Sequence, residues 1–131
     1  MDPTNRPIIP RPVNLNFFTI YFPITAYISI LHRISGVLIF FLIPSLLWLL
    51  QESLVSESSW DLVHTLFHIT WFKVICWVSL SGLIYHWIAG IRHLLLDVHL
   101  GETKKGGKIG SIIVLFLSGL SIFALGVWLW F

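Results

Sequence analysis

The chain has 131 residues, of which 56% are hydrophobic and only 11% are charged, and its mean hydropathy is +0.88. Soluble domains carry about 25% charged residues, so this chain has too few polar residues to cover a water-exposed surface. Its formal net charge of +2 is scattered, which leaves nucleic-acid binding without support. The lone cysteine, Cys76, excludes a disulfide framework and a cysteine-ligated iron–sulfur cluster.

Residues 1–22 are irregular in pattern and precede the first long apolar segment. They contain Pro3, Pro7, Pro10 and Pro12, which prevent a continuous helix. No cleavable signal peptide is expected, because this stretch has no long apolar core. We expect a cytoplasmic or interfacial segment over residues 1–22, followed by one transmembrane domain over residues 23–131.

Three long apolar segments run over residues 24–50, 70–96 and 109–131. Each exceeds the roughly 20 residues that a helix needs to cross a bilayer core. The sequence therefore predicts an all-α membrane protein with three transmembrane helices. Pro44 should bend the first of them, and the third, which has no ionisable side chain, is interpreted as scaffold.

Charge is distributed unevenly around these segments. Arg6 and Arg11 precede the first segment, and Lys104, Lys105 and Lys108 lie between the second and the third. The loop over residues 51–69 has acidic residues but no lysine or arginine. By the positive-inside rule, the N-terminus is predicted to be cytoplasmic and the C-terminus periplasmic. Four tryptophans near the outer ends of the segments fit an interfacial belt: Trp48, Trp71, Trp128 and Trp130.

The loop between the first two segments contains His64 and His68, at the spacing of a two-histidine metal site. Only Asp61 or Glu57 stands near enough in sequence to be a third ligand. We therefore interpret both histidines as polar residues of a short surface helix. The other loop contains Gly106 and Gly107, which predict a flexible connection.

The second apolar segment carries an unusual polar stripe. His86, Gly90, His93 and Asp97 follow the spacing of one helix face, with Arg92 to one flank. An ionised Asp or Arg at the centre of a membrane helix costs roughly 2.5–3.5 kcal/mol. Something other than lipid must therefore face this stripe.

A histidine in the middle of a span, such as His86, has few uses. It can ligate a haem iron, relay protons, or only hydrogen-bond a neighbouring helix. Gly90, one turn away, would leave room for a flat cofactor. Partners for haem propionates could come from Arg33, His32 or His93. If the haem has two axial histidines, the second must come from another membrane chain, because the remaining histidines lie nearer the inner surface or outside.

Ser29 and Arg33 lie one turn apart on the first segment and share a helix face. A hydroxyl and a guanidinium suit the carbonyl oxygen of a quinone, because the guanidinium stabilises the negative charge that develops on reduction. The alternative is that Arg33 only anchors the helix at the membrane interface.

Three motifs carry a family resemblance: RPVNL at residues 11–15, SILHRISG at 29–36 and HWIAGIRHLLLD at 86–97. In this order they closely resemble the cytochrome b large membrane-anchor subunit of bacterial succinate dehydrogenase, respiratory complex II. The resemblance extends over essentially the whole chain. Leu96 and His99 depart from the family pattern at the end of the second segment, which puts in question only the docking of the iron–sulfur subunit.

The resemblance implies roles for individual residues. His86 would be an axial ligand of haem b, with the other ligand supplied by a histidine of the small anchor subunit. Ser29 and Arg33 would line the ubiquinone site, while His32 and His93 would lie toward the haem propionates. The role of Asp97 stays open.

The resemblance also implies a function for the whole complex. The chain would be a non-catalytic subunit in the bacterial inner membrane, with a flavoprotein subunit, an iron–sulfur subunit and a small hydrophobic anchor subunit as partners. Electrons from succinate would reach ubiquinone at this subunit. Two alternatives remain: a haem-free structural anchor, and the anchor of a fumarate reductase.

Overall fold

The computed structural model describes residues 21–131, so the predicted interfacial segment lies almost wholly outside the described residues. Four helices follow one another: α1 (Ile24–Val55), α2 (Glu57–Leu66), α3 (Thr70–Asp97) and α4 (Lys104–Trp130). Of these, α1, α3 and α4 are long and apolar enough to cross a membrane. Over the described part of the chain, the predicted all-α architecture with three membrane spans is confirmed, and α2 is the predicted short helix between the first two spans.

The connection between α3 and α4 differs from the prediction. Gly106 and Gly107 were expected in a flexible loop, but both lie in the first turns of α4. The helix begins early because the Thr103 hydroxyl accepts a hydrogen bond from the Gly106 amide at 3.0 Å and so caps its N-terminus. The preceding loop returns so tightly that a Cβ at position 106 would lie 2.9 Å from the carbonyl oxygen of Gly101.

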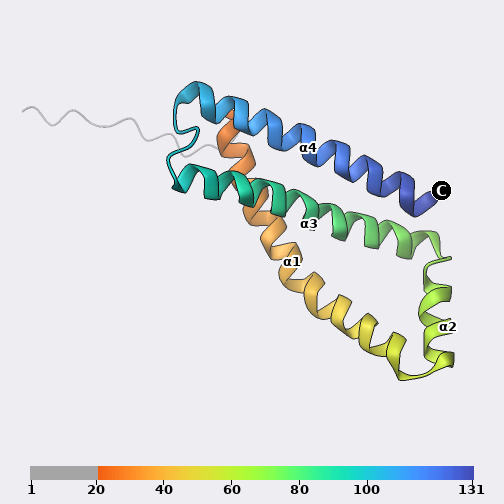
Figure 1. Ribbon diagram of the computed structural model, residues 1–131. Helices are drawn as coiled ribbons and strands as arrows, with labels where there is room; N and C mark the ends of the chain where they lie inside the picture. Colours follow the sequence, from red (N-terminus) through yellow and green to blue (C-terminus); the bar gives the residue numbers. More distant parts are fainter. Residues whose placement is uncertain (1–20) are drawn as a thin grey trace, which may run out of the picture.

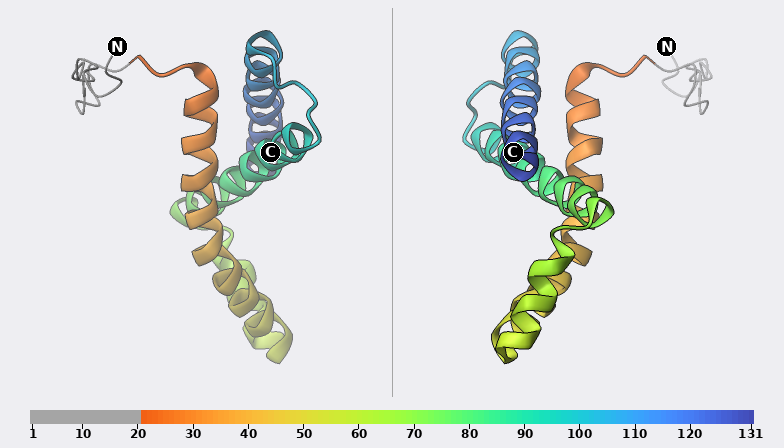
Figure 2. Two further views of the ribbon diagram at one scale, coloured as in Figure 1. Left: turned by 90° about the vertical axis from the view of Figure 1, so that its left-hand side faces the viewer. Right: turned by 90° about the vertical axis from the view of Figure 1, so that its right-hand side faces the viewer.

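The three long helices meet at one end of the molecule. At this end, which we call the shared end, α1 and α4 begin and α3 finishes (Figure 1). From there α3 and α4 run side by side in opposite directions, whereas α1 crosses α3 and then diverges, and α2 links it back to the start of α3 (Figures 1 and 2). Pro44 lies inside α1, where its missing N–H removes one backbone hydrogen bond.

The small buried core sits where the three spans come together. Ile28 of α1, Ala89 of α3 and Val114 of α4 are its members, each at most 3% exposed. The face of α4 that reaches the core presents two buried serines, Ser111 and Ser118, on either side of Val114. Small residues of this kind let helix backbones approach closely within a membrane.

Arg92 is the most buried charged side chain of residues 21–131, with 9% of its surface exposed. Sequence reasoning placed it on a flank of the polar stripe, and the structure shows that this flank packs against α4. Its guanidinium donates to the Gly107 carbonyl at 3.3 Å, and a Cβ at Gly110 would lie 3.3 Å from its Nε. Glycines at the start of α4 therefore make room for the arginine.

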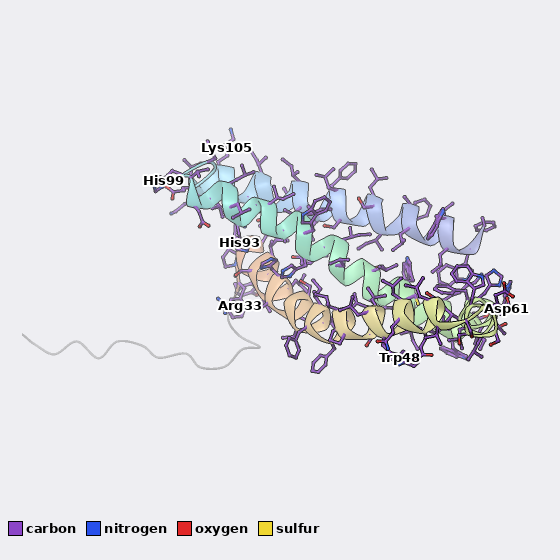
Figure 3. All side chains as sticks on the ribbon, turned by 60° about the horizontal axis from the view of Figure 1, so that its bottom comes forward. Arg33, Trp48, Asp61, His93, His99 and Lys105 are labelled. Atoms are coloured by element: carbon purple, nitrogen blue, oxygen red, sulfur yellow. The ribbon has the colours of Figure 1, made fainter. Side chains whose placement is uncertain are left out.

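Beyond the shared end, α1 is little covered by the rest of the chain. Phe40, Phe41, Leu47 and Trp48 are each more than half exposed. Figure 3 shows Trp48 on this open part of α1, with Asp61 beyond it and Arg33, His93 and Lys105 at the opposite end. Such an apolar surface is stable only against lipid or other protein.

The tight approach at Gly106 generates a prediction. Gly106→Ala should lower the free energy of unfolding by about 1–3 kcal/mol, because its Cβ would press on backbone atoms that cannot move independently. The thermal midpoint of the purified full-length chain in detergent, followed by circular dichroism, measures the loss.

Gly119→Ala is the matched control, since it adds the same methyl group to the same helix with nothing within 4 Å. Its midpoint should equal or exceed that of the unmodified chain. Equal midpoints for the two variants would contradict the argument.

Candidate functional site

Three histidines come together near the shared end. His32 of α1 stacks on His86 of α3, with ring centroids 4.0 Å apart and planes inclined by 14°. The rings of His93 and His32 are also neighbours, with centroids 4.9 Å apart and planes inclined by 43°. His86 and His93, which belong to the predicted polar stripe of α3, therefore both point toward α1.

Helix geometry accounts for the pairing of His32 with His86. His32 lies eight residues into α1 (32 − 24), and His86 lies eleven residues before the end of α3 (97 − 86). At ~1.5 Å per residue, these positions are about 12 and 16 Å from the shared end. Sequence reasoning placed His32 nearer the membrane surface than His86, and the structure shows that the difference is small enough for the rings to stack.

The His86 ring is held by hydrogen bonds at one nitrogen. Its Nδ1 lies 3.0 Å from the Ser35 hydroxyl oxygen and 3.1 Å from the carbonyl oxygen of His32. The Ser35 hydroxyl donates its own proton to that carbonyl at 2.8 Å. The network is satisfied when Nδ1 carries the proton and donates to both oxygens, which assigns the lone pair to Nε2.

Two glycines shape the space around these rings. A Cβ at Gly36 would lie 3.2 Å from Cε1 of His86, and one at Gly90 would lie 3.5 Å from Nε2 of His32. The space over Gly90, expected to admit a flat cofactor, therefore contains the His32 ring. Both glycines allow α1 and α3 to approach closely enough for the imidazoles to stack.

Neither of the two stacked histidines makes a hydrogen bond through Nε2 to residues 21–131. Nε2 of His32 is buried and makes no hydrogen bond to residues 21–131. Both hydrogen bonds of the His86 ring to residues 21–131 are made at Nδ1, so Nε2 of His86 has no protein partner among these residues. A neutral imidazole with its Nδ1–H anchored and its Nε2 unpaired fits an iron ligand, because the bonded nitrogen fixes the tautomer and the ring orientation.

Ser29 and Arg33 lie on α1 beside this cluster. Arg33 is exposed and forms no ion pair with any described residue, while Ser29 is partly buried. A guanidinium within a span must reach water, a polar ligand or another chain. The two side chains are thus available to a molecule that approaches α1 at this level.

Two residues of the site were not singled out by sequence reasoning. Ser35 anchors His86, and the Tyr85 hydroxyl donates to the carbonyl oxygen of Ile28, next to Ser29, at 3.0 Å. Ser35 belongs to the motif at residues 29–36, and Tyr85 immediately precedes His86. Their places in or beside the motifs could be read from the sequence, but the contact between α1 and α3 that gives them a role could not.

The remaining candidate residues lie apart from the histidine cluster. Asp97 is exposed at the end of α3, and His99 pairs with Glu102 at 2.8 Å. On the far side, His64 and His68 have rings 5.0 Å apart. Over residues 21–131, no three histidine, cysteine, aspartate or glutamate side chains are grouped to hold a metal ion.

Comparison with known proteins identifies relatives of the whole chain. The model of the succinate dehydrogenase/fumarate reductase transmembrane subunit family matches residues 8–130. The succinate dehydrogenase cytochrome b556 subunit of Coxiella burnetii is 40% identical over 92% of this chain and 97% of its own. That of Rickettsia prowazekii is 35% identical over 76% and 78%. The cytochrome b560 subunit of Marchantia polymorpha is 31% identical over 90% and 89%.

The match to the family model runs through all three membrane spans and both motifs of the histidine cluster. The chain is therefore a multi-pass membrane protein that belongs to the succinate dehydrogenase/fumarate reductase transmembrane subunit family, with succinate dehydrogenase cytochrome b subunits as its relatives.

Proposed function

We propose that this chain is the large membrane-anchor subunit of a succinate:ubiquinone oxidoreductase and that His86 is one axial ligand of its haem b. The anchored Nδ1 of His86 carries the proposal, because it leaves the Nε2 lone pair without a hydrogen bond to residues 21–131. The relatives are named cytochrome b subunits, which fits a haem at this level. When bound, haem b supplies a one-electron redox centre close to the quinone site.

The second axial ligand comes from a small hydrophobic anchor subunit. The rings of His32 and His86 lie face to face at 4.0 Å, so their nitrogens could not both hold one iron between them. His32 therefore does not complete the pair. His64 and His68 lie at the other end of the molecule, on or just beyond α2. A histidine of another chain supplies the ligand, and haem b is shared between two subunits.

Ubiquinone binds beside α1, with Ser29 and Arg33 as its polar contacts. The Arg33 guanidinium stabilises negative charge on a quinone oxygen during reduction, and the Ser29 hydroxyl donates a hydrogen bond. The Tyr85 hydroxyl fixes the backbone of α1 next to Ser29 and so orients this pair. His32 and His93, which lie nearer the shared end than His86, would contribute donors toward the haem propionates.

The rest of the reaction takes place on other subunits. Succinate is oxidised in a flavoprotein subunit, and an iron–sulfur subunit passes electrons to the ubiquinone site. Lys104, Lys105 and Lys108 lie at or near the start of α4, which supports a cytoplasmic location for the shared end in a bacterial inner membrane. The N-terminus would then be cytoplasmic and the C-terminus periplasmic, with residues 23–131 as the haem- and quinone-binding domain.

Two alternatives make different predictions. A haem-free structural anchor would use His86 only to bond α1 to α3 and would carry no b-type absorption. The anchor of a fumarate reductase would use the same fold with a quinol as electron donor, and the family description covers both enzymes. The relatives named as succinate dehydrogenase subunits favour succinate oxidation.

The haem ligand is tested by His86→Ala in the purified membrane complex. The reduced-minus-oxidised visible spectrum should lose at least half of its b-type absorption, because the iron loses a ligand from this chain. His99→Ala, which removes an exposed histidine paired with Glu102, should keep the full spectrum. A full spectrum in the His86 variant would move the ligand elsewhere, and a wild-type complex without haem would favour the structural anchor.

The quinone site is tested by Arg33→Leu in the same complex. Ubiquinone reduction should fall about tenfold or more, which corresponds to ~1.4 kcal/mol of lost transition-state stabilisation. Succinate oxidation with a soluble dye as acceptor should be unchanged, since it bypasses the membrane site. Lys105→Leu removes one positive charge near the same end of the molecule and should leave both activities intact. Normal ubiquinone turnover in the Arg33 variant would refute the site.

A further inference from the structure

Ser35 differs from the other buried serines of the described chain. It is 4% exposed, and its hydroxyl oxygen connects two helices, from the His32 carbonyl of α1 to Nδ1 of His86 on α3. Ser111 is fully buried, but its hydroxyl only returns to the Gly107 carbonyl of its own helix. Ser118 makes no hydrogen bond to residues 21–131. Ser35 is thus the buried serine of this part of the chain that touches the candidate haem ligand.

The hydrogen bonds around Ser35 are consistent with one placement of the protons on Ser35 and His86. The hydroxyl proton goes to the His32 carbonyl at 2.8 Å, so the Ser35 oxygen accepts from His86. The Nδ1–H of His86 is then shared between the Ser35 oxygen at 3.0 Å and the His32 carbonyl at 3.1 Å. Two acceptors on one proton fix both the tautomer and the rotation of the ring.

The surroundings reinforce this fixed rotation. The His32 ring covers one face of the His86 ring at 4.0 Å, and the backbone at Gly36 approaches Cε1 so closely that a Cβ there would lie 3.2 Å away. The ring is therefore held by α1 at its face, its edge and its Nδ1. Ser35 supplies the one side-chain hydrogen bond among these contacts.

We propose that Ser35 is a positioning residue that sets the orientation and the electron-donor strength of the haem ligand His86; this inference rests on the proposed role of His86. A hydrogen bond from Nδ1–H to an acceptor makes the opposite nitrogen a stronger donor to iron. In the low dielectric of a membrane span, such a bond is stronger than in water. A stronger donor favours the oxidised iron, so Ser35 lowers the reduction potential of the haem.

The test compares Ser35→Ala, Ser35→Cys and Ser111→Ala in the purified complex. Potentiometric titration of the b-type absorption gives the midpoint potential, and electron paramagnetic resonance of the oxidised haem reports the orientation of the axial rings. Ser35→Ala should raise the midpoint potential and change the resonance signal. Ser35→Cys should shift the potential in the same direction by less, because sulfur is a weak acceptor.

Ser111→Ala is the matched control, since it removes a fully buried hydroxyl without touching His86, and it should leave both signals unchanged. Wild-type potential and resonance in haem-containing Ser35→Ala would overturn the inference. If that variant loses its haem, the cysteine variant decides by the same two measurements. A wild-type complex without haem, or a full spectrum in His86→Ala, would instead overturn the proposed function.

Discussion

Polar groups inside a membrane span must find their partners within the protein, and this requirement fixes where α1 meets α3. His86 and Ser35 lie far apart in sequence, on α3 and α1, and their side chains hydrogen-bond to each other. The carbonyl oxygen of His32 accepts a hydrogen bond from both. An unpaired polar group of this kind costs about 1–3 kcal/mol when buried. The contact therefore specifies one crossing point between helices whose apolar surfaces would otherwise pack in many ways.

Glycine makes the polar contacts sterically possible. Gly90 faces His32 at ordinary contact distance. Gly36 faces the His86 ring and Gly110 faces the Arg92 guanidinium, each so closely that a Cβ would require the neighbouring side chain to shift. Toward the other end, Gly126 does the same for Trp77, whose indole donates to the Ile122 carbonyl at 3.2 Å. Where lipid removes the hydrophobic drive for association, close approach and interhelical hydrogen bonds hold the spans together.

The three spans could be predicted from the sequence because they depend only on the length and hydropathy of local segments. The polar stripe of α3 was also readable, since helical spacing alone brings His86 and His93 to one face. The start of α4 was missed because Gly106 and Gly107 disfavour a helix by themselves, whereas the Thr103 cap and the tight loop hold them in one. The low helix propensity of the two glycines was outweighed there by a cap and a turn formed by their immediate neighbours.

The candidate residues could be named from the sequence one by one, but their arrangement could not. Ser29, Arg33 and His86 stand out because polar groups are costly within a span. Ser35 and Tyr85 do not, because serine and tyrosine are ordinary in such helices until the crossing of α1 and α3 is known. A partner for Ser35 lies 51 positions away along the chain, and one for Tyr85 lies 57 away. Only a relative placement of two helices can reveal such pairs.

Within residues 21–131, some polar groups of the membrane spans have no partner and some apolar side chains stay uncovered. Nε2 of His86 lacks a partner there, the Arg33 guanidinium forms no ion pair, and the apolar side chains of α1 beyond the crossing stay uncovered. Lipid tails can cover the last of these but offer no hydrogen-bond partner to the first two. Under the proposed function, a haem held between His86 and a second membrane chain, and a quinone that accepts from Arg33, would meet them together. The arrangement of these unmet groups thus supports a subunit whose site is completed by assembly.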